Sequence, residues 1–233
     1  MAITDYDHQA VIWCGQKADL PHFLNQADAL NAKAKGKAAA AQHQITVDSQ
    51  AMFPGMGEAD DEALTDLLAP LTDKSRLYIC GHGSAGAVPK FVGWDAKTFA
   101  GLLKSRGLKR AKLINLVSCE LARDYRPNLP GRVFPLADSF AAQFHRELKD
   151  QEPALLTEVR AYTWLLAVNL GWIGDVPTGG KVMLEKEDSK VIDEWEYKPP
   201  GYKISFYWED GAQRRRYMNK SGNSLIEFPL AVR

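Results

Sequence analysis

Short apolar runs rich in β-branched residues alternate with stretches of helical periodicity over the first two thirds of the chain. Each run is bounded by glycine or polar residues and is shorter than a buried helix, so the pattern predicts strands rather than helices. The expected strands cover residues 9–14, 43–49, 76–81, 112–119 and 158–168.

Helical patterns separate these runs, at residues 19–40, 58–71, 95–107 and 136–150. In the third pattern Phe99, Leu102 and Leu103 share one face, and Gly107 is placed to end the helix. Because strands and helices alternate, we predict a mainly parallel sheet with helices on both faces.

The character of the chain changes near residue 170. The remainder is polar, with short alternating runs and turn signals at Pro199-Pro200-Gly201, Asp210-Gly211 and Ser221-Gly222. Such a pattern is typical of antiparallel hairpins. We therefore expect one domain over residues 1–233, with an α/β core over 1–170 and a β-flap with C-terminal strands over 171–233.

Composition narrows the function classes. The chain has 29 Lys plus Arg and 29 Asp plus Glu, so general binding to nucleic acid is not expected. The N-terminus lacks a secretory signal, and no apolar run approaches the roughly 20 residues of a membrane span. Three cysteines without paired spacing argue against a disulfide framework. We expect the protein to be cytoplasmic in the cell that makes it. The sequence does not indicate its oligomeric state.

Two strand ends carry candidate chemistry. The stretch "RLYICGHGSAG" (76–86) ends in a glycine-rich turn around His82, and "AKLINLVSCELA" (111–122) ends at Cys119. The carboxyl ends of neighbouring parallel strands meet at one edge of a sheet, so these residues can meet there. His82 could be a loop residue, a metal ligand or the base of a pair with Cys119. The metal use is disfavoured, because no second ligand has suitable spacing.

Cysteine and histidine together can form a nucleophile and its base. We expect Gly81 and Gly83 to leave room for a substrate and to direct backbone N–H groups at an oxyanion. A helix start after Cys119 would lower the pKa of its thiol. The alternative from the residues alone is an inert buried cysteine beside a loop histidine.

These motifs resemble a known family. "LYICGHGSAG" followed by "INLVSCELA" is similar to the His-Gly and strand-terminal Cys signature of the caspase-like (clan CD) cysteine peptidases. Within that clan the chain most resembles the self-cleaving cysteine protease domain of RTX and large clostridial toxins. "QAVIWCGQKADL" and "VRAYTWLLAV" resemble further strands of that domain. The resemblance implies an α/β fold, a caspase-like three-layer α/β/α sandwich with a C-terminal β-flap.

The resemblance also implies residue roles. Cys119 would be the nucleophile and His82 the general base, with backbone N–H groups of Gly83 and Cys119 as the oxyanion hole. Part of the family has an acidic residue that assists the histidine. Asp19 is the nearest match, although it fits a helix N-cap equally well, and Asp48 is a second candidate.

The toxin domains are activated by inositol hexakisphosphate. The resemblance therefore implies a site at which this polyphosphate binds as an allosteric activator. No cofactor is expected for the chemistry itself. Solvated surface charge is the alternative for each basic residue. The matching positions are Lys33, Lys35, Lys37, Lys181, Lys186, Lys203, Arg214, Arg215 and Arg216.

The leading hypothesis is a cysteine endopeptidase that cuts a protein or peptide substrate through an acyl-enzyme. The toxin relatives imply a toxin or effector role, with delivery to a target cell by a signal-independent route. Because this chain is short and starts at its own Met1, we expect it to cut another protein. The alternatives are a partner-activated caspase-like protease and a catalytically inactive module that binds a polyanion or protein.

Overall fold

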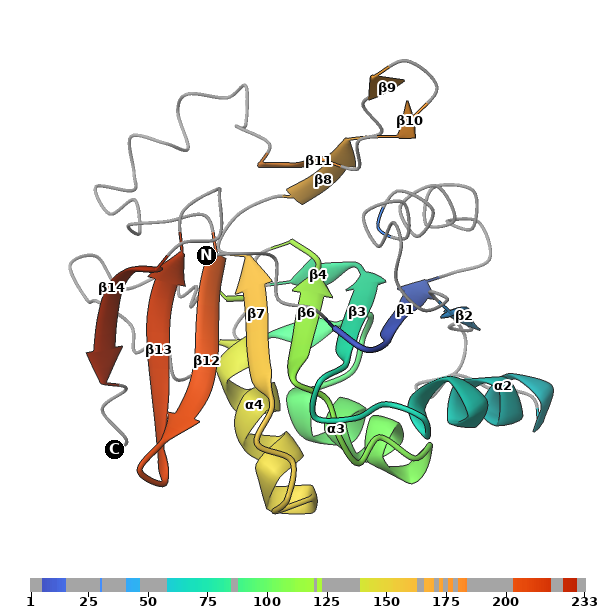
Figure 1. The fold of residues 1–233 in the computed structure, drawn as a ribbon, viewed down its shortest axis with the longest axis horizontal. Coiled ribbons are helices and arrows are strands. Elements are labelled where there is room, and N and C mark those ends of the chain that lie inside the picture. Colours follow the sequence, from blue (N-terminus) through green and yellow to red (C-terminus); the bar gives the residue numbers. More distant parts are fainter. Residues whose placement is uncertain are drawn as a thin grey trace.

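An eight-stranded sheet forms the centre of the residues that the computed structural model describes (Figure 1). The described residues are 6–15, 30, 41–46, 58–84, 88–119, 121–122, 139–162, 166–169, 172–173, 176–177, 180–183, 203–218 and 224–229. Across the sheet the strands follow the order β14-β13-β12-β7-β6-β3-β1-β2. Their bounds are β1 Gln9–Gly15, β2 Ala41–Thr46, β3 Arg76–Gly81, β6 Leu113–Val117, β7 Glu158–Tyr162, β12 Lys203–Glu209, β13 Ala212–Met218 and β14 Ser224–Pro229.

Across the sheet, β2, β1, β3, β6 and β7 pair in parallel, each with the next. The strands β7, β12, β13 and β14 pair antiparallel, again each with the next. The predicted mixed α/β fold with a mainly parallel sheet is confirmed. The C-terminal strands extend this sheet through β7, which local patterns did not indicate. The predicted turn at Asp210-Gly211 joins β12 to β13, and both residues have positive φ, 52° and 77°. Such a turn matches the twist of a hairpin.

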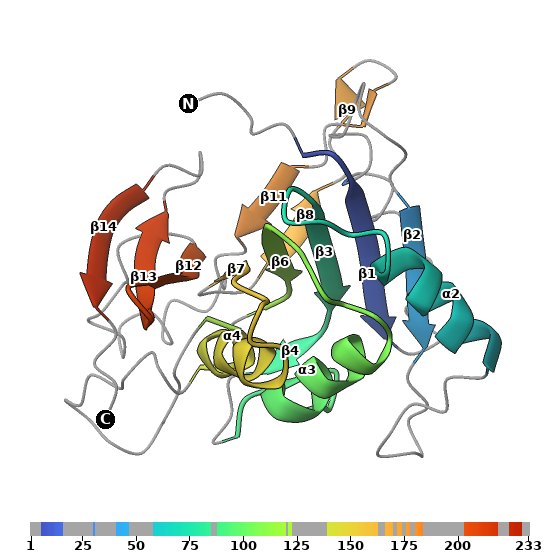
Figure 2. The same ribbon diagram turned by 60° about the horizontal axis from the view of Figure 1, so that its bottom comes forward.

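Three helices, α2 Glu58–Leu68, α3 Ala96–Ser105 and α4 Phe140–Gln151, lie on one side of the sheet (Figure 2). Asp95 caps α3 by accepting a hydrogen bond from Thr98 N at 2.8 Å, and Gly107 follows the helix with φ of +91°. Ser139 caps α4 by accepting from Ala142 N at 3.3 Å. The predicted helix over 95–107 is thus confirmed together with its predicted end at Gly107, and the cap by Asp95 is added by the structure.

Strand alternation gives the sheet two different faces. The core face packs on the helices and is apolar; its residues include Ile12, Ile79, Leu116, Val159 and Phe206. The opposite face is also largely buried but carries polar groups. On it Gln9 is buried and donates to the carbonyl of Leu30, the one described residue of the predicted helix 19–40, at 3.2 Å.

Two predicted strands end earlier than expected. The run 112–119 forms β6 only to Val117, because Ser118 and Cys119 lie in a bend. The run 158–168 divides into β7 and β8 (Leu166–Asn169), and β8 pairs with β11 (Gly180–Met183) outside the main sheet. Two further antiparallel pairs are β4 (Gly83–Ser84) with β5 (Lys90–Phe91), and β9 (Trp172–Ile173) with β10 (Val176–Pro177). No helix in the described ranges is long and apolar enough to span a membrane.

Candidate active site

His82 and Cys119 follow neighbouring strands at the same edge of the sheet. β3 and β6 pair in parallel, and the last register pair joins Cys80 to Val117. His82 and Cys119 each stand two residues beyond this pair. Both residues therefore lie just past the carboxyl ends of neighbouring parallel strands. The predicted meeting of the two strand ends is therefore present in the fold.

The backbones that carry the two residues are in direct contact. A Cβ atom on Gly83 would lie 2.4 Å from the carbonyl oxygen of Cys119 and 2.6 Å from Ser118 Oγ. A Cβ atom on Gly81 would lie 2.6 Å from the ring of Phe91 and 2.8 Å from the carbonyl oxygen of Cys14. We expected both glycines to leave room for a substrate. On the side where a side chain would stand, the chain itself fills that room, so the glycines permit close packing of the two strand ends.

A strained turn fixes the backbone of His82. The carbonyl oxygen of His82 accepts from Val92 N at 2.8 Å. Val92 and Gly93 have φ of 49° and 88°, at the centre of a turn whose ends, Phe91 and Trp94, exchange backbone hydrogen bonds of 2.9 Å. A β-branched residue seldom takes positive φ, because its Cβ crowds the backbone. Such strain is typical of places where the surrounding structure fixes a functional segment.

The segment after Cys119 is also anchored at its far end. Ala122 N donates to the carbonyl of Tyr162 at the end of β7, at 3.0 Å. Ala141 N, in the first turn of α4, donates to the carbonyl of Leu121 at 2.9 Å. The helix start that we expected directly after Cys119 is not found at Leu121 and Ala122, which form a turn. Cys119 therefore lies between two fixed points, β6 and the start of α4.

The three cysteines differ in exposure. None of the three is in a disulfide; Cys14 and Cys80 are fully buried, whereas Cys119 is partly exposed. Burial raises the pKa of the Cys14 thiol well above its ordinary value, which keeps it protonated and unreactive. His82 is exposed to solvent. Cys119 is thus the least buried of the three cysteines.

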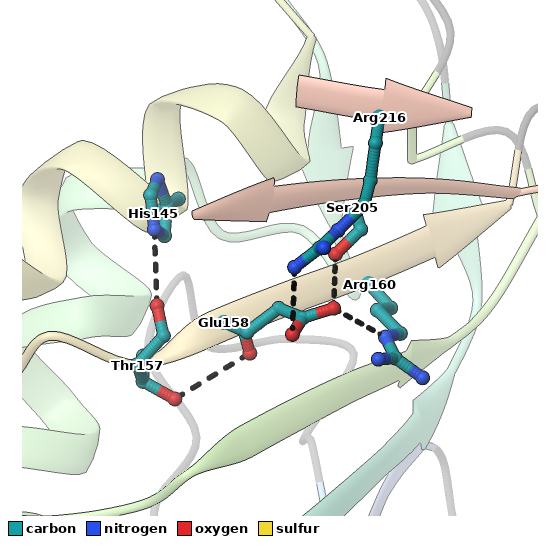
Figure 3. Close-up of polar contacts among 6 residues, drawn as sticks. All are labelled: His145, Thr157, Glu158, Arg160, Ser205 and Arg216. Carbon is teal, nitrogen blue, oxygen red and sulfur yellow. Dashed lines mark hydrogen bonds and ion pairs between the residues drawn. The ribbon is translucent and has the colours of Figure 1, made fainter. Parts of the chain in front are cut away.

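A polar cluster lies on the opposite face across β7, β12 and β13 (Figure 3). Arg160 Nε lies 2.6 Å from Glu158 Oε1, Arg216 lies 3.4 Å from Glu158 Oε2, and Ser205 Oγ also donates to Glu158. Burial alone would raise the pKa of Glu158, but Arg160, Ser205 and Arg216 outweigh it and lower the pKa. The ion pair of Glu158 and Arg160 could have been predicted from the "EVRAY" run, because strand alternation places both side chains on one face.

The predicted polyphosphate residues are partly separated. Register pairs join Ser205 to Arg216 and Tyr207 to Arg214, whereas Arg215 pairs with the core residue Phe206. Arg214 and Arg216 therefore share the polar face with Lys203, and Arg215 takes the opposite one. Lys181 lies in β11, where the structure describes only the backbone. Asp19, Asp48, Lys33, Lys35, Lys37 and Lys186 lie outside the described residues.

The model of the Peptidase C80 family matches residues 4–171, which is most of the chain and includes both His82 and Cys119. The chain belongs to the Peptidase C80 family. This family consists of cysteine peptidases, so a protein or peptide is the expected substrate. The match ends before β12, so the basic residues of β12 and β13 lie outside the region shared with the Peptidase C80 model. No curated protein matches the chain closely.

Proposed function

We propose that the protein is a cysteine endopeptidase in which Cys119 is the nucleophile and His82 the general base. The observation that carries this proposal is the contact between Gly83 and Cys119, which joins the two strand ends directly. Support also comes from the partial exposure of Cys119, which is in no disulfide, and from membership of a cysteine peptidase family. Asp19 stays a prediction for the third residue.

The chemistry follows from these roles. His82 takes the thiol proton, and the Cys119 thiolate attacks the peptide carbonyl carbon, so that the negative charge moves to the carbonyl oxygen. Backbone N–H groups of Gly83 and Cys119 would stabilise this oxyanion. The C–N bond then breaks as His82 gives its proton to the leaving amine. Water, deprotonated by His82, attacks the acyl-enzyme and releases the acid product and the thiol.

The test compares three variants. Cys119→Ala and His82→Ala should fold but lose cleavage of fluorescein-labelled casein, and Cys119→Ala should lose labelling by iodoacetamide. Cys14→Ala is the control, because its thiol is buried and should not contribute to either signal. Cleavage by Cys119→Ala at the wild-type rate would overturn the assignment.

The competing function is a catalytically inactive module that binds a polyanion or protein. The partly exposed polar face with its arginines is the observation that favours it. Native Cys119 that resists iodoacetamide at neutral pH, in a folded protein without casein cleavage, would support this second function. Action as a toxin or effector, cleavage of itself or of another protein, and the cellular location remain predictions.

We further propose that inositol hexakisphosphate raises the activity by binding the polar face at Lys203, Arg214 and Arg216. Convergent cationic side chains are what a polyphosphate requires, and register places these three on neighbouring strands of one face. Lys203→Gln and Arg214→Gln should each weaken binding about tenfold in calorimetry, since a hydrogen bond to a charged group contributes roughly 1.5–3 kcal/mol. Arg215→Gln is the matched control on the other face and should bind normally. Equal weakening in all three would indicate general charge attraction.

A further inference from the structure

Ser118 is a buried serine whose hydroxyl has no hydrogen-bond partner within the described part of the chain. Its side-chain oxygen is shielded from solvent, and the residue is 3% exposed. It stands between the last residue of β6 and Cys119. A buried hydroxyl without a partner costs free energy, because the hydrogen bonds it makes with water in the unfolded chain are lost.

Other buried serines behave differently. Ser75 Oγ donates to Asp7 Oδ1 at 2.9 Å and accepts from Thr72 N at 2.8 Å. Ser139 accepts from Ala142 N, and Ser205 donates to Glu158. The fold thus provides partners for three buried serine hydroxyls, whereas the hydroxyl of Ser118 has none among the residues that the structure describes. The exception lies directly before Cys119 in the chain.

The surroundings of Ser118 define what it can influence. Its Oγ is among the atoms that a Cβ on Gly83 would strike, together with the carbonyl oxygen of Cys119 and Leu121 Cδ2. The hydroxyl therefore lies at the contact between the segment after His82 and the segment that holds Cys119.

We propose that Ser118 is a positioning residue for Cys119: its spare hydroxyl gains an acceptor when the nucleophile segment takes up its position with substrate bound. This inference rests on the proposed peptidase function. It assigns Ser118 no contact with the substrate. A hydrogen bond that forms only with substrate bound stabilises the substrate-bound position of the segment over its position in the free protein. Only such a difference between the two states can raise the rate.

The test separates this role from a structural one by comparing Ser118→Ala with Ser75→Ala. Ser75→Ala removes a buried hydroxyl with partners at the opposite edge of the sheet. It should lower the unfolding temperature by about 2–4 °C and leave kcat unchanged. Ser118→Ala removes a hydroxyl without a partner, so the unfolding temperature should stay the same or rise. Its kcat on fluorescein-labelled casein should fall about tenfold with KM unchanged, which corresponds to about 1.4 kcal/mol.

Two results would overturn the inference: unchanged kcat in Ser118→Ala, or a loss of kcat in step with a loss of thermal stability. Wild type and Cys119→Ala are measured in the same assay. If both are equally inactive, the peptidase function and the role of Ser118 fail together. If wild type is active and Ser118→Ala matches it, only the role of Ser118 fails.

Discussion

The α-carbon of Gly83 lies against the carbonyl oxygen of Cys119, so closely that a side-chain carbon on Gly83 would come within 2.4 Å of that oxygen. Real Cβ atoms do not approach backbone oxygens so closely, since the repulsion at this distance is steep. The relationship fixes how near the segment after His82 can come to the nucleophile. It also makes the absence of a side chain at residue 83 a requirement of the site.

Gly83→Ala should therefore separate the two strand ends. The atoms in its way include a backbone oxygen, which cannot rotate aside as a flexible side chain would. We expect a loss of about 1–3 kcal/mol in the free energy of unfolding, and a loss of casein cleavage larger than this destabilisation explains. Urea unfolding and cleavage assays on the same samples measure both.

Gly101→Ala is the control for that substitution. Gly101 lies inside α3, and a Cβ there would meet the movable end of Gln151 at 3.1 Å. Alanine in a helix is favoured over glycine by roughly 0.5–1 kcal/mol, so stability should hold or rise and cleavage should persist. Equal behaviour of the two variants would contradict the close contact at Gly83.

The strained turn at Val92 leads to a second prediction. Asparagine tolerates positive φ much better than a β-branched residue, so Val92→Asn should be more stable than Val92→Thr by about 1 kcal/mol. Both variants lose the apolar contacts of the partly buried valine, and threonine keeps the branching, so their difference isolates the backbone. Thermal unfolding measures it. A threonine variant as stable as the asparagine variant would show that the turn is not strained.

Glu158 is predicted to hold β7 to β12 and β13. Glu158→Gln removes the charge that balances Arg160 and Arg216 on a mostly buried face, and should cost about 3 kcal/mol of unfolding free energy. Glu209→Gln is the control, because the Glu209 side chain is 56% exposed where it pairs with Arg214. Exposed pairs contribute roughly 0–1 kcal/mol. If urea unfolding gave similar losses for both, the partly buried cluster around Glu158 would contribute no more than an exposed ion pair.

The sequence predicts well those features that depend on neighbouring residues. The bounds of β3, the end of α3 at Gly107 and the turn at Asp210-Gly211 follow from an apolar run, a glycine after a helical pattern and an Asp-Gly pair. The pairing of β12 with β7 depends on contacts between distant residues, such as Ser205 with Glu158, and no local pattern indicates it. The same reason explains why β6 was expected to run on to Cys119.

The candidate site shows the same division. His82 and Cys119 could be proposed because each ends a recognisable apolar run, and parallel strands bring such ends together. The packing role of Gly83 and the unpaired hydroxyl of Ser118 could not be predicted, because both depend on how closely the segment after His82 approaches the segment that holds Cys119. Sequence thus indicates which residue types meet, and the structure adds the spacing that decides what each can do.

Acid sensitivity is the last prediction, and it depends on His145. This buried histidine in α4 accepts at Nδ1 from Gln213 at 2.7 Å, and its Nε2–H donates to the carbonyl of Thr157 at 3.0 Å. Gln213 also donates to the carbonyl of Ala142, so its amide group faces His145 as a donor. The neutral ring satisfies both contacts, whereas a protonated ring would place two donors against each other. Burial lowers the pKa of His145 from 6.5 to about 3.

The sign of the effect follows from proton binding. Between pH 6.5 and about 3 the unfolded chain binds a proton at residue 145 that the folded chain excludes, so stability falls as the pH falls. The slope in this window should be roughly 1 kcal/mol per pH unit from this residue. Urea unfolding of wild type and His145→Gln at pH 7, 5.5 and 4.5 isolates it, since glutamine does not titrate. The difference between the two proteins should shrink as the pH falls; a constant difference would mean that His145 is not held neutral.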